Sequence, residues 1–285
     1  MILPRGIISD PTLPEIPASD IEVIRKILAD RTGFQLSSYK DKCVRRRISI
    51  RIRATHSSTA AEYCTLLAGD DRELAHLVKV LTIHVSHFFR NPSTFQKLRQ
   101  EIIPALFALS QKAGGRPLTF WSVGCSTGEE PYSLALLLLE HFDGQAAVTP
   151  VSILASDVNA AILDQARDAL YGPERLGEVP PDLVARRFTP EGDRFRLCDE
   201  ARAMVDFCRA DLVSADPFPA CDLILCRNVL IYFERPQQEV ILKRFAGALA
   251  GGGFLVLGKS ETLVGGARGN FQTVCPVERI YRATQ

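Results

Sequence analysis

Apolar residues recur at helical spacing along the first ninety residues. Ile21, Ile24 and Leu28 mark one face of a first helix. Ser19, with an acidic residue three positions later, predicts that this helix begins with Ser19 as N-cap, and Gly33 predicts its end. Three more helices are predicted, over about residues 39–54, 59–67 and 71–81.

Prolines, glycines and changes in the hydrophobic pattern predict four segments along the chain. Residues 1–18 contain four prolines and predict a mobile leader. The helices form a small all-helical domain over residues 19–92, and a connecting helix with a linker follows over residues 93–116. A glycine–glycine–arginine–proline sequence closes that linker, so a second domain is predicted over residues 117–285.

In the second domain, predicted strands alternate with predicted helices. The strands cover about residues 118–123, 151–155, 205–208, 221–226 and 254–257. Single helices between strands imply right-handed crossovers and a largely parallel sheet. The alternation stops at about residues 171–203, which predicts a small β insertion. The predicted fold class is therefore α/β, a Rossmann-like domain with a small β insertion, preceded by a small all-helical domain.

Composition adds a few exclusions. A net charge of +1 gives no overall attraction to nucleic acid or to anionic membranes. The eight cysteines form no C-x-x-C pair, which favours reduced thiols over a zinc site. The sequence shows neither a signal peptide nor a long apolar run, so a cytoplasmic protein is expected. His84 and His87 lack an evident third ligand, and no metal site is predicted.

Three features with chemical potential lie directly after predicted strands. They are the turn at residues 124–128, which has a glycine at each end, Asp157, and Arg227 with Asn228. Ligands bind at the carboxyl ends of strands in open parallel sheets, so these features are expected to form one site. A carboxylate in the position of Asp157 is suited to ribose hydroxyls.

A glycine turn at this position is compatible with several nucleotide ligands. A dinucleotide site needs a G-x-G-x-x-G turn against a pyrophosphate, whereas this turn is G-x-x-x-G. Glu129 and Glu130 follow it directly, and two carboxylates would repel a phosphate. They suit the ammonium of a methionine moiety, which favours S-adenosylmethionine (SAM) over NAD or ATP.

At this point the chain resembles a known family, the CheR chemotaxis methyltransferases. The matching segments are Phe88-Phe-Arg-Asn91, Trp121–Pro131, Ala155-Ser-Asp157, Cys226–Phe233 and Gly258-Lys-Ser-Glu261. The resemblance covers nearly the whole chain after residue 18. It implies a cytoplasmic protein-glutamate O-methyltransferase that uses SAM, releases S-adenosylhomocysteine and acts on chemoreceptor methylation helices. It also implies receptor recognition by residues 19–92 and methyl transfer by residues 117–285.

The resemblance implies roles for individual residues. Glu129 is expected to hold the methionine ammonium, and Asp157 the ribose. Arg90, Arg227 and Tyr232 are expected to be catalytic, with Arg90 over the sulfonium and the phenol of Tyr232 paired with Arg227. The full set expected to contact the cofactor is His84, Ser86, Arg90, Gly124, Glu129, Asp157, Asp211, Leu212, Arg227 and Asn228.

Two positions depart from the family pattern. The stretch before Phe88 usually reads Asn-x-Thr, whereas this chain has His84-Val-Ser86. Asp211 stands beside Leu212, where the family flanks the adenine and often has asparagine. An imidazole replaces an amide in the first case, and a hydrogen-bond donor is lost in the second.

The expected reaction makes modest chemical demands. A glutamate carboxylate has an unperturbed pKa of about 4.3, so it is already a nucleophile at neutral pH. Methyl transfer therefore requires alignment and desolvation more than a general base. Arg90 and Tyr232 fit as orienting donors.

The predicted second helix carries a run of basic residues. Lys42, Arg46 and Arg53 share one face at spacings of four and seven. A solvated face, a nucleic-acid surface and a receptor-docking face are three readings of this run. No aromatic residue lies within it, which disfavours nucleic acid. The family resemblance favours docking on acidic methylation helices.

Other functions and partners remain to be separated by experiment. A nucleic-acid or small-molecule methyltransferase, or a SAM-binding regulatory module, would share the fold, and other chemotaxis proteins are further candidate partners. Some family members bind a receptor C-terminal peptide through a longer, glycine-richer loop in the β insertion. Here the turn at residues 190–193 is short with one glycine, so no tight tethering is expected.

Overall fold

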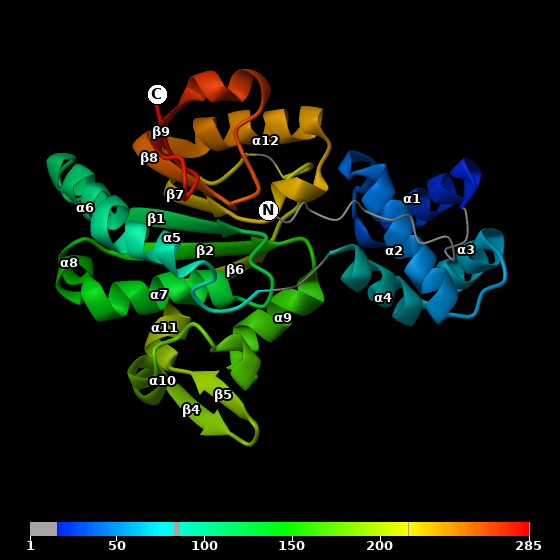
Figure 1. Cartoon of the computed structure of the whole chain (residues 1–285), viewed down its shortest axis with the longest axis horizontal. Helices are drawn as coiled ribbons and strands as arrows, with labels where there is room; N and C mark the ends of the chain where they lie inside the picture. The colour runs from blue at the N-terminus through cyan, green and yellow to red at the C-terminus, as the bar shows by residue number, and fades with distance from the viewer. Residues whose placement is uncertain (1–15, 83–85, 216, 285) are drawn as a thin grey trace, which may run out of the picture. The chain divides into compact units, whose positions relative to one another are not determined.

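The computed structural model describes residues 16–82, 86–215 and 217–284, and it divides into two units, Met1–Ile83 and His84–Gln285 (Figure 1). The predicted leader lies largely outside the described residues. Within them, no helix is both long and apolar enough to cross a membrane.

The first unit is made of helices. They are α1 (Ala18–Thr32), α2 (Asp41–Ala54), α3 (Ala60–Gly69) and α4 (Asp71–Leu81), with a short 3₁₀ turn over Leu36–Ser38. Ile24, Ile48 and Leu67 are fully buried and form part of its core. The prediction of Ser19 as N-cap is wrong: Pro17 precedes the first turn, and its carbonyl accepts the amides of Asp20 and Ile21.

The second unit is built on a seven-stranded sheet in the order β6-β2-β1-β7-β8-β10-β9. Five of these strands pair in parallel, and β10 runs antiparallel between β8 and β9. The bounds are β1 (Leu118–Val123), β2 (Val151–Asp157), β6 (Val205–Arg209), β7 (Cys221–Cys226), β8 (Leu249–Leu257), β9 (Phe271–Cys275) and β10 (Ile280–Ala283). This mixed sheet after a helical unit confirms the predicted fold class.

Helices cover both faces of this sheet (Figure 1). They are α7 (Glu129–His141), α8 (Asp143–Val148), α9 (Ala160–Asp168), α11 (Asp199–Ala203) and α12 (Arg235–Ala248), with short 3₁₀ turns over Leu230–Tyr232 and Gly265–Asn270. Phe120 joins the core that also contains buried residues of α7. Its neighbour Trp121 faces the other way, onto Phe245 of α12 at 5.7 Å between ring centroids. The alternation of β1 thus fills both layers.

Residues 86–92, expected in the helical domain, and residues 93–112, expected in the connector, belong to the second unit. Phe88 packs edge-on against Tyr171 and Phe188, and α5 (Pro92–Lys97) and α6 (Ile103–Lys112) contribute to the same core. The two units divide after Ile83, nine residues before the expected boundary at 92. A π-helical turn, Leu98–Ile102, separates α5 from α6. It lies just before Pro104, a residue without the amide that a regular helix requires.

A three-stranded antiparallel sheet, β3-β5-β4, interrupts the alternation where an insertion was expected. Its strands are β3 (Leu170–Tyr171), β4 (Phe188–Glu191) and β5 (Arg194–Leu197), with a 3₁₀ turn over Pro173–Arg175 and α10 over Pro181–Arg187. Leu197, Phe188 and Leu183 bury their side chains in the same core as α7. The insertion is therefore packed onto the second unit.

Candidate functional site

The glycine turn brings two predicted segments into contact at the carboxyl edge of the sheet. Gly124 has φ 64°, and a Cβ there would lie 2.5 Å from Cγ2 of Val229, in the segment after β7. Gly128 has φ 89° and caps α7, which begins at Glu129. The positive φ angles explain why glycine occupies both ends of the turn.

Asp157 ends β2 beside this turn and is nearly buried. Its Oδ2 accepts the amide of Ser126 at 3.0 Å, and its Oδ1 accepts the amide of Asn159 at 3.0 Å. Each carboxylate oxygen retains a lone pair for a further donor. The hydroxyl of Ser126 is buried and has no hydrogen-bond partner among the described residues.

Glu129 has a fully buried side chain whose charge is compensated locally. The hydroxyl of Thr127 lies 2.8 Å from each carboxylate oxygen, and Nη1 of Arg175 lies 3.5 Å from Oε1. Burial raises the pKa of Glu129, while Thr127 and Arg175 oppose that rise. Arg175 comes from the insertion and was missed by the sequence analysis. No sequence spacing links it to Glu129.

Arg227 joins the three segments that carry the candidate chemistry. Its Nη1 lies 3.2 Å from Oε2 of Glu130, and Nη2 donates to the carbonyl of Arg90 at 2.6 Å and to Oδ1 of Asn91 at 2.7 Å. Glu130 also accepts the hydroxyl of Ser122 at 2.8 Å. The Nε of Arg227 is buried without a hydrogen-bond partner among the described residues. Glu130 was expected, together with Glu129, to repel phosphate and to suit an ammonium; the structure pairs it with Arg227. The expected pairing of Tyr232 with Arg227 remains a prediction.

Arg90 lies in a constrained loop. Phe89 has φ 51° and Asn91 has φ 62°, conformations that cost energy in residues other than glycine. The amide of Phe89 donates to the hydroxyl of Ser133 at 2.8 Å, which in turn donates to the carbonyl of Glu129. The loop is therefore fixed by α7 on one side and by Arg227 on the other.

The segment after β7 is organised by a buried carboxylate. Glu261 accepts the amides of Gly258, Asn228 and Ile231 at 2.6, 2.9 and 3.2 Å. Burial raises the pKa of Glu261, and these amides oppose the rise. This arrangement fixes Asn228 and the 3₁₀ turn that contains the half-buried Tyr232. In the sequence, the Gly258–Glu261 segment was recognisable only as a match to the family, and no role was predicted for Glu261.

The remaining predicted contacts are distributed around the same edge. Asp211 accepts the amide of Val213 at 2.9 Å, and the carbonyl of the buried Leu212 accepts from Arg244. The carbonyl of Ser86 accepts from Arg175. His84 lies outside the described residues.

The basic run on α2 separates into two sets. Lys42, Arg46 and Arg53 are exposed. Two other arginines of the run are used inside the helical unit: Arg47 donates to the carbonyl of Leu81, and Arg51 pairs with the buried Glu73 at 2.5 Å. Only part of the run is therefore available to a partner.

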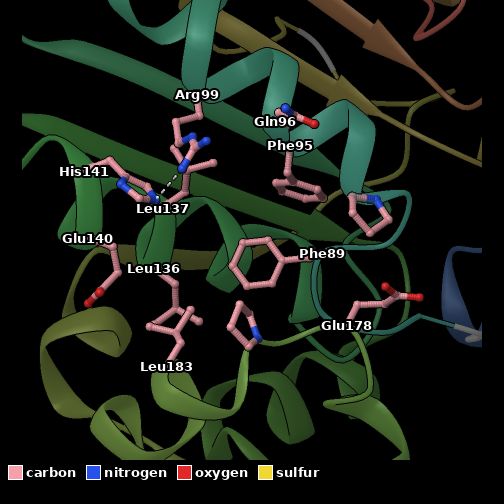
Figure 2. Close-up of a pocket in the computed structure, with 12 residues that line it drawn as sticks. Phe89, Phe95, Gln96, Arg99, Leu136, Leu137, Glu140, His141, Glu178 and Leu183 are labelled. Carbon is pink, nitrogen blue, oxygen red and sulfur yellow. Dashed lines mark hydrogen bonds between the residues drawn. The ribbon is translucent and has the colours of Figure 1, made fainter.

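A hollow of about 240 Å³ lies elsewhere in the second unit, between α5, α7 and the insertion (Figure 2). Phe89, Phe95 and Leu183 line its apolar part, and Arg99 lies 3.5 Å from His141 at one end. None of the predicted site residues that the structure describes lines it. It is distinct from the candidate site.

The residues at the sheet edge fit SAM. A buried carboxylate suits its ammonium, the carboxylate of Asp157 suits the ribose diol, and the free Ser126 hydroxyl offers a further polar contact. The fold and the site define a SAM-dependent methyltransferase.

The family model "CheR methyltransferase, SAM binding domain" matches residues 84–278, and "CheR methyltransferase, all-alpha domain" matches residues 19–82. The chain belongs to the CheR methyltransferase family.

Curated relatives agree with this placement. Chemotaxis protein methyltransferase 2 of Pseudomonas aeruginosa is 37% identical, with 86% of this chain and 87% of that protein covered. Chemotaxis protein methyltransferase of Borreliella burgdorferi is 28% identical, with 88% and 90% covered. An uncharacterized 104.1 kDa protein of Rhodobacter capsulatus is 34% identical over 94% of this chain, which spans only 28% of that protein.

Proposed function

We propose that this chain transfers the methyl group of SAM to glutamate side chains on the cytoplasmic part of bacterial chemoreceptors. The observation that carries the proposal is the match to both CheR domains together, supported by relatives named chemotaxis methyltransferases over most of their length. The site is in keeping with this chemistry because a carboxylate acceptor needs alignment more than deprotonation.

SAM supplies an electrophilic methyl group, which the acceptor oxygen takes as the carbon–sulfur bond breaks. Within the site, Glu129 is assigned to the ammonium and Asp157 to the ribose. Gly124 and Asn228 border the same edge, and Asp211 with Leu212 is assigned to the adenine. Ser86 and His84 complete the cofactor set by resemblance alone.

Three residues are assigned to the reacting end. Arg90 orients the anionic acceptor near the sulfonium, and Tyr232 donates a hydrogen bond beside the transferred methyl. Arg227 acts through position: its contacts with Glu130, the Arg90 carbonyl and Asn91 hold the loop that carries Arg90. Excluding water around these groups strengthens each interaction.

The exposed face of α2 is assigned to receptor docking. Lys42, Arg46 and Arg53 are exposed, and Ile50 between them is 43% exposed. A basic strip with one apolar residue suits an amphipathic helix that carries acidic residues. Methylation helices of the receptor are the proposed partner, and other chemotaxis proteins are a further expectation.

The test is the choice of acceptor. Labelled SAM, incubated with receptor cytoplasmic fragments, tRNA and a mixture of small carboxylic acids, should label the receptor fragments on glutamate. Label found only in nucleic acid or in small molecules would overturn the proposal, and SAM binding without any transfer would favour a regulatory module.

Docking is expected to need no receptor tail. The hairpin between β4 and β5 turns through Gly192 and Asp193, and it offers no long loop around a peptide. Calorimetry with a receptor C-terminal peptide should therefore give no binding at micromolar concentration. A tight isotherm would contradict this expectation.

A further inference from the structure

Arg175 has contacts that the proposed chemistry does not account for. It ends the 3₁₀ turn Pro173–Arg175 of the insertion, far in sequence from both segments that it contacts. Its guanidinium lies 3.5 Å from Glu129 and donates to the carbonyl of Ser86, and its own carbonyl accepts the amide of Phe88 at 3.1 Å. Three backbone and side-chain contacts thus converge on one residue.

We propose that Arg175 is a positioning residue of the cofactor site, which joins Glu129 to the Ser86–Phe88 segment and so couples cofactor binding to the placement of Arg90. The inference rests on the proposed roles of Glu129 and Arg90. It assigns the insertion a part in the methyl-transfer site itself.

The carboxylate of Glu129 can bind Arg175 and the cofactor ammonium at the same time. Thr127 bridges both oxygens and Arg175 approaches Oε1, so Oε2 retains capacity for an ammonium. The Glu129 side chain is 1% exposed, whereas that of Arg175 is 30% exposed. A buried carboxylate is costly without a cationic partner, and Arg175 supplies that partner before the cofactor arrives.

A short path leads from Arg175 to Arg90. The segment from Ser86 to Phe88 is held by Arg175, and Phe88 packs on Tyr171 and Phe188 of the insertion. Phe89, with φ 51°, follows directly and leads into Arg90. Because the loop is strained, release of one restraint is expected to increase its mobility.

The surroundings of Glu129 offer a matched control. Arg175, Arg194, Glu174 and Asp168 line a cavity of about 330 Å³ beside the Glu129 carboxylate. Among the described residues, the Arg194 side chain forms no hydrogen bond or ion pair, in contrast to that of Arg175. His87 is a further group that lowers the pKa of Glu129, and the Tyr171 phenol donates to the carbonyl of Thr127.

The test compares Arg175→Gln and Arg175→Lys with Arg194→Gln in the full chain. Calorimetry should show that Arg175→Gln binds S-adenosylhomocysteine on the order of 10-fold more weakly at neutral pH, which corresponds to loss of one charge-assisted contact. Arg175→Lys should recover part of the affinity, and Arg194→Gln should match the unaltered chain.

The pH dependence separates a charge effect from a loss of structure. Arg175 lowers the pKa of Glu129, so Arg175→Gln should raise it further and leave the carboxylate protonated at higher pH. As the pH falls, affinity should therefore begin to decline at a higher pH in Arg175→Gln than in the unaltered chain. An acid limb at the same pH, with affinity uniformly reduced, would overturn the inference.

Amide hydrogen exchange tests the coupling to Arg90. S-adenosylhomocysteine should slow exchange across residues 86–90 in the unaltered chain and fail to do so in Arg175→Gln. Equal protection in both would overturn the coupling. Glu129→Gln separates failure of the proposed function from failure of this inference. Unchanged ligand affinity in Glu129→Gln would refute the role of Glu129. If Glu129→Gln loses affinity while Arg175→Gln binds the ligand like the unaltered chain, only the inference on Arg175 is refuted.

Discussion

Charged side chains have opposite surroundings at the cofactor edge of the second unit and on the basic face of α2. At the cofactor edge Glu129, Asp157, Arg227 and Glu261 are buried, and each has partners at hydrogen-bond distance or in an ion pair. On α2, Lys42 and Arg46 are exposed, and their side chains form no hydrogen bond or ion pair with the described residues. Buried, fixed charges suit a reaction that needs defined geometry, whereas free surface charges suit a partner that arrives from solution.

Helix α2 contains both kinds of charge within one turn and a half. Arg51 donates to both oxygens of Glu73, which also accepts the phenol of Tyr63 at 2.7 Å. Arg46, five residues earlier, points to solvent. One helix therefore carries both a buried, paired arginine and an exposed one, so substitution of each can be compared within the same element.

The largest effect is expected from Arg51→Ala. Removal of this guanidinium leaves the buried Glu73 carboxylate with only its phenol partner, which should lower the free energy of unfolding by about 3 kcal/mol. Arg46→Ala should change it by less than about 0.5 kcal/mol. Urea unfolding of both variants measures the difference, and equal stabilities would show that the buried pair adds nothing.

A smaller free-energy change is expected from Tyr232→Phe. Loss of one positioned donor in the reacting region should reduce kcat on the order of 10²-fold. The affinity for S-adenosylhomocysteine should stay within about twofold, because the phenol is assigned to the acceptor side. If affinity and turnover fell in equal proportion, the role given to Tyr232 would be wrong.

The smallest effect is expected on the exposed face. Charge reversal in the double variant Lys42→Glu with Arg46→Glu should raise KM for the receptor about 10-fold at low salt, and less at high salt. Cofactor affinity and unfolding should be unchanged. Loss of cofactor binding together with receptor methylation would indicate misfolding.

Much of the fold was predictable because it is encoded locally. Apolar periodicity located α2 and α4, and glycine at position 33 marked the end of α1, where the structure has φ 72°. The sheet followed from strand–helix alternation, and the family resemblance supplied the cofactor. Local patterns could not show that residues 92–112 pack into the second unit, because that depends on which apolar faces meet.

The site was predictable where one residue follows a strand, and not where two distant segments meet. Asp157 could be found because it ends β2. Arg175 and Glu261 could not, since their value lies in contacts with Glu129 and with the amides after β7. Arg47 and Arg51 likewise resemble docking residues in sequence, and only the tertiary structure shows that they serve the helical unit.

The claim that the fixed charges serve methyl transfer to a carboxylate is tested most directly by the bond that forms. Receptor cytoplasmic fragments labelled from methyl-labelled SAM would be treated with alkali, and released methanol would be measured. The account predicts that the label leaves as methanol and maps to glutamates, as a carboxylate methyl ester requires. Label that resists alkali would place the methyl group on nitrogen or carbon and would contradict the account.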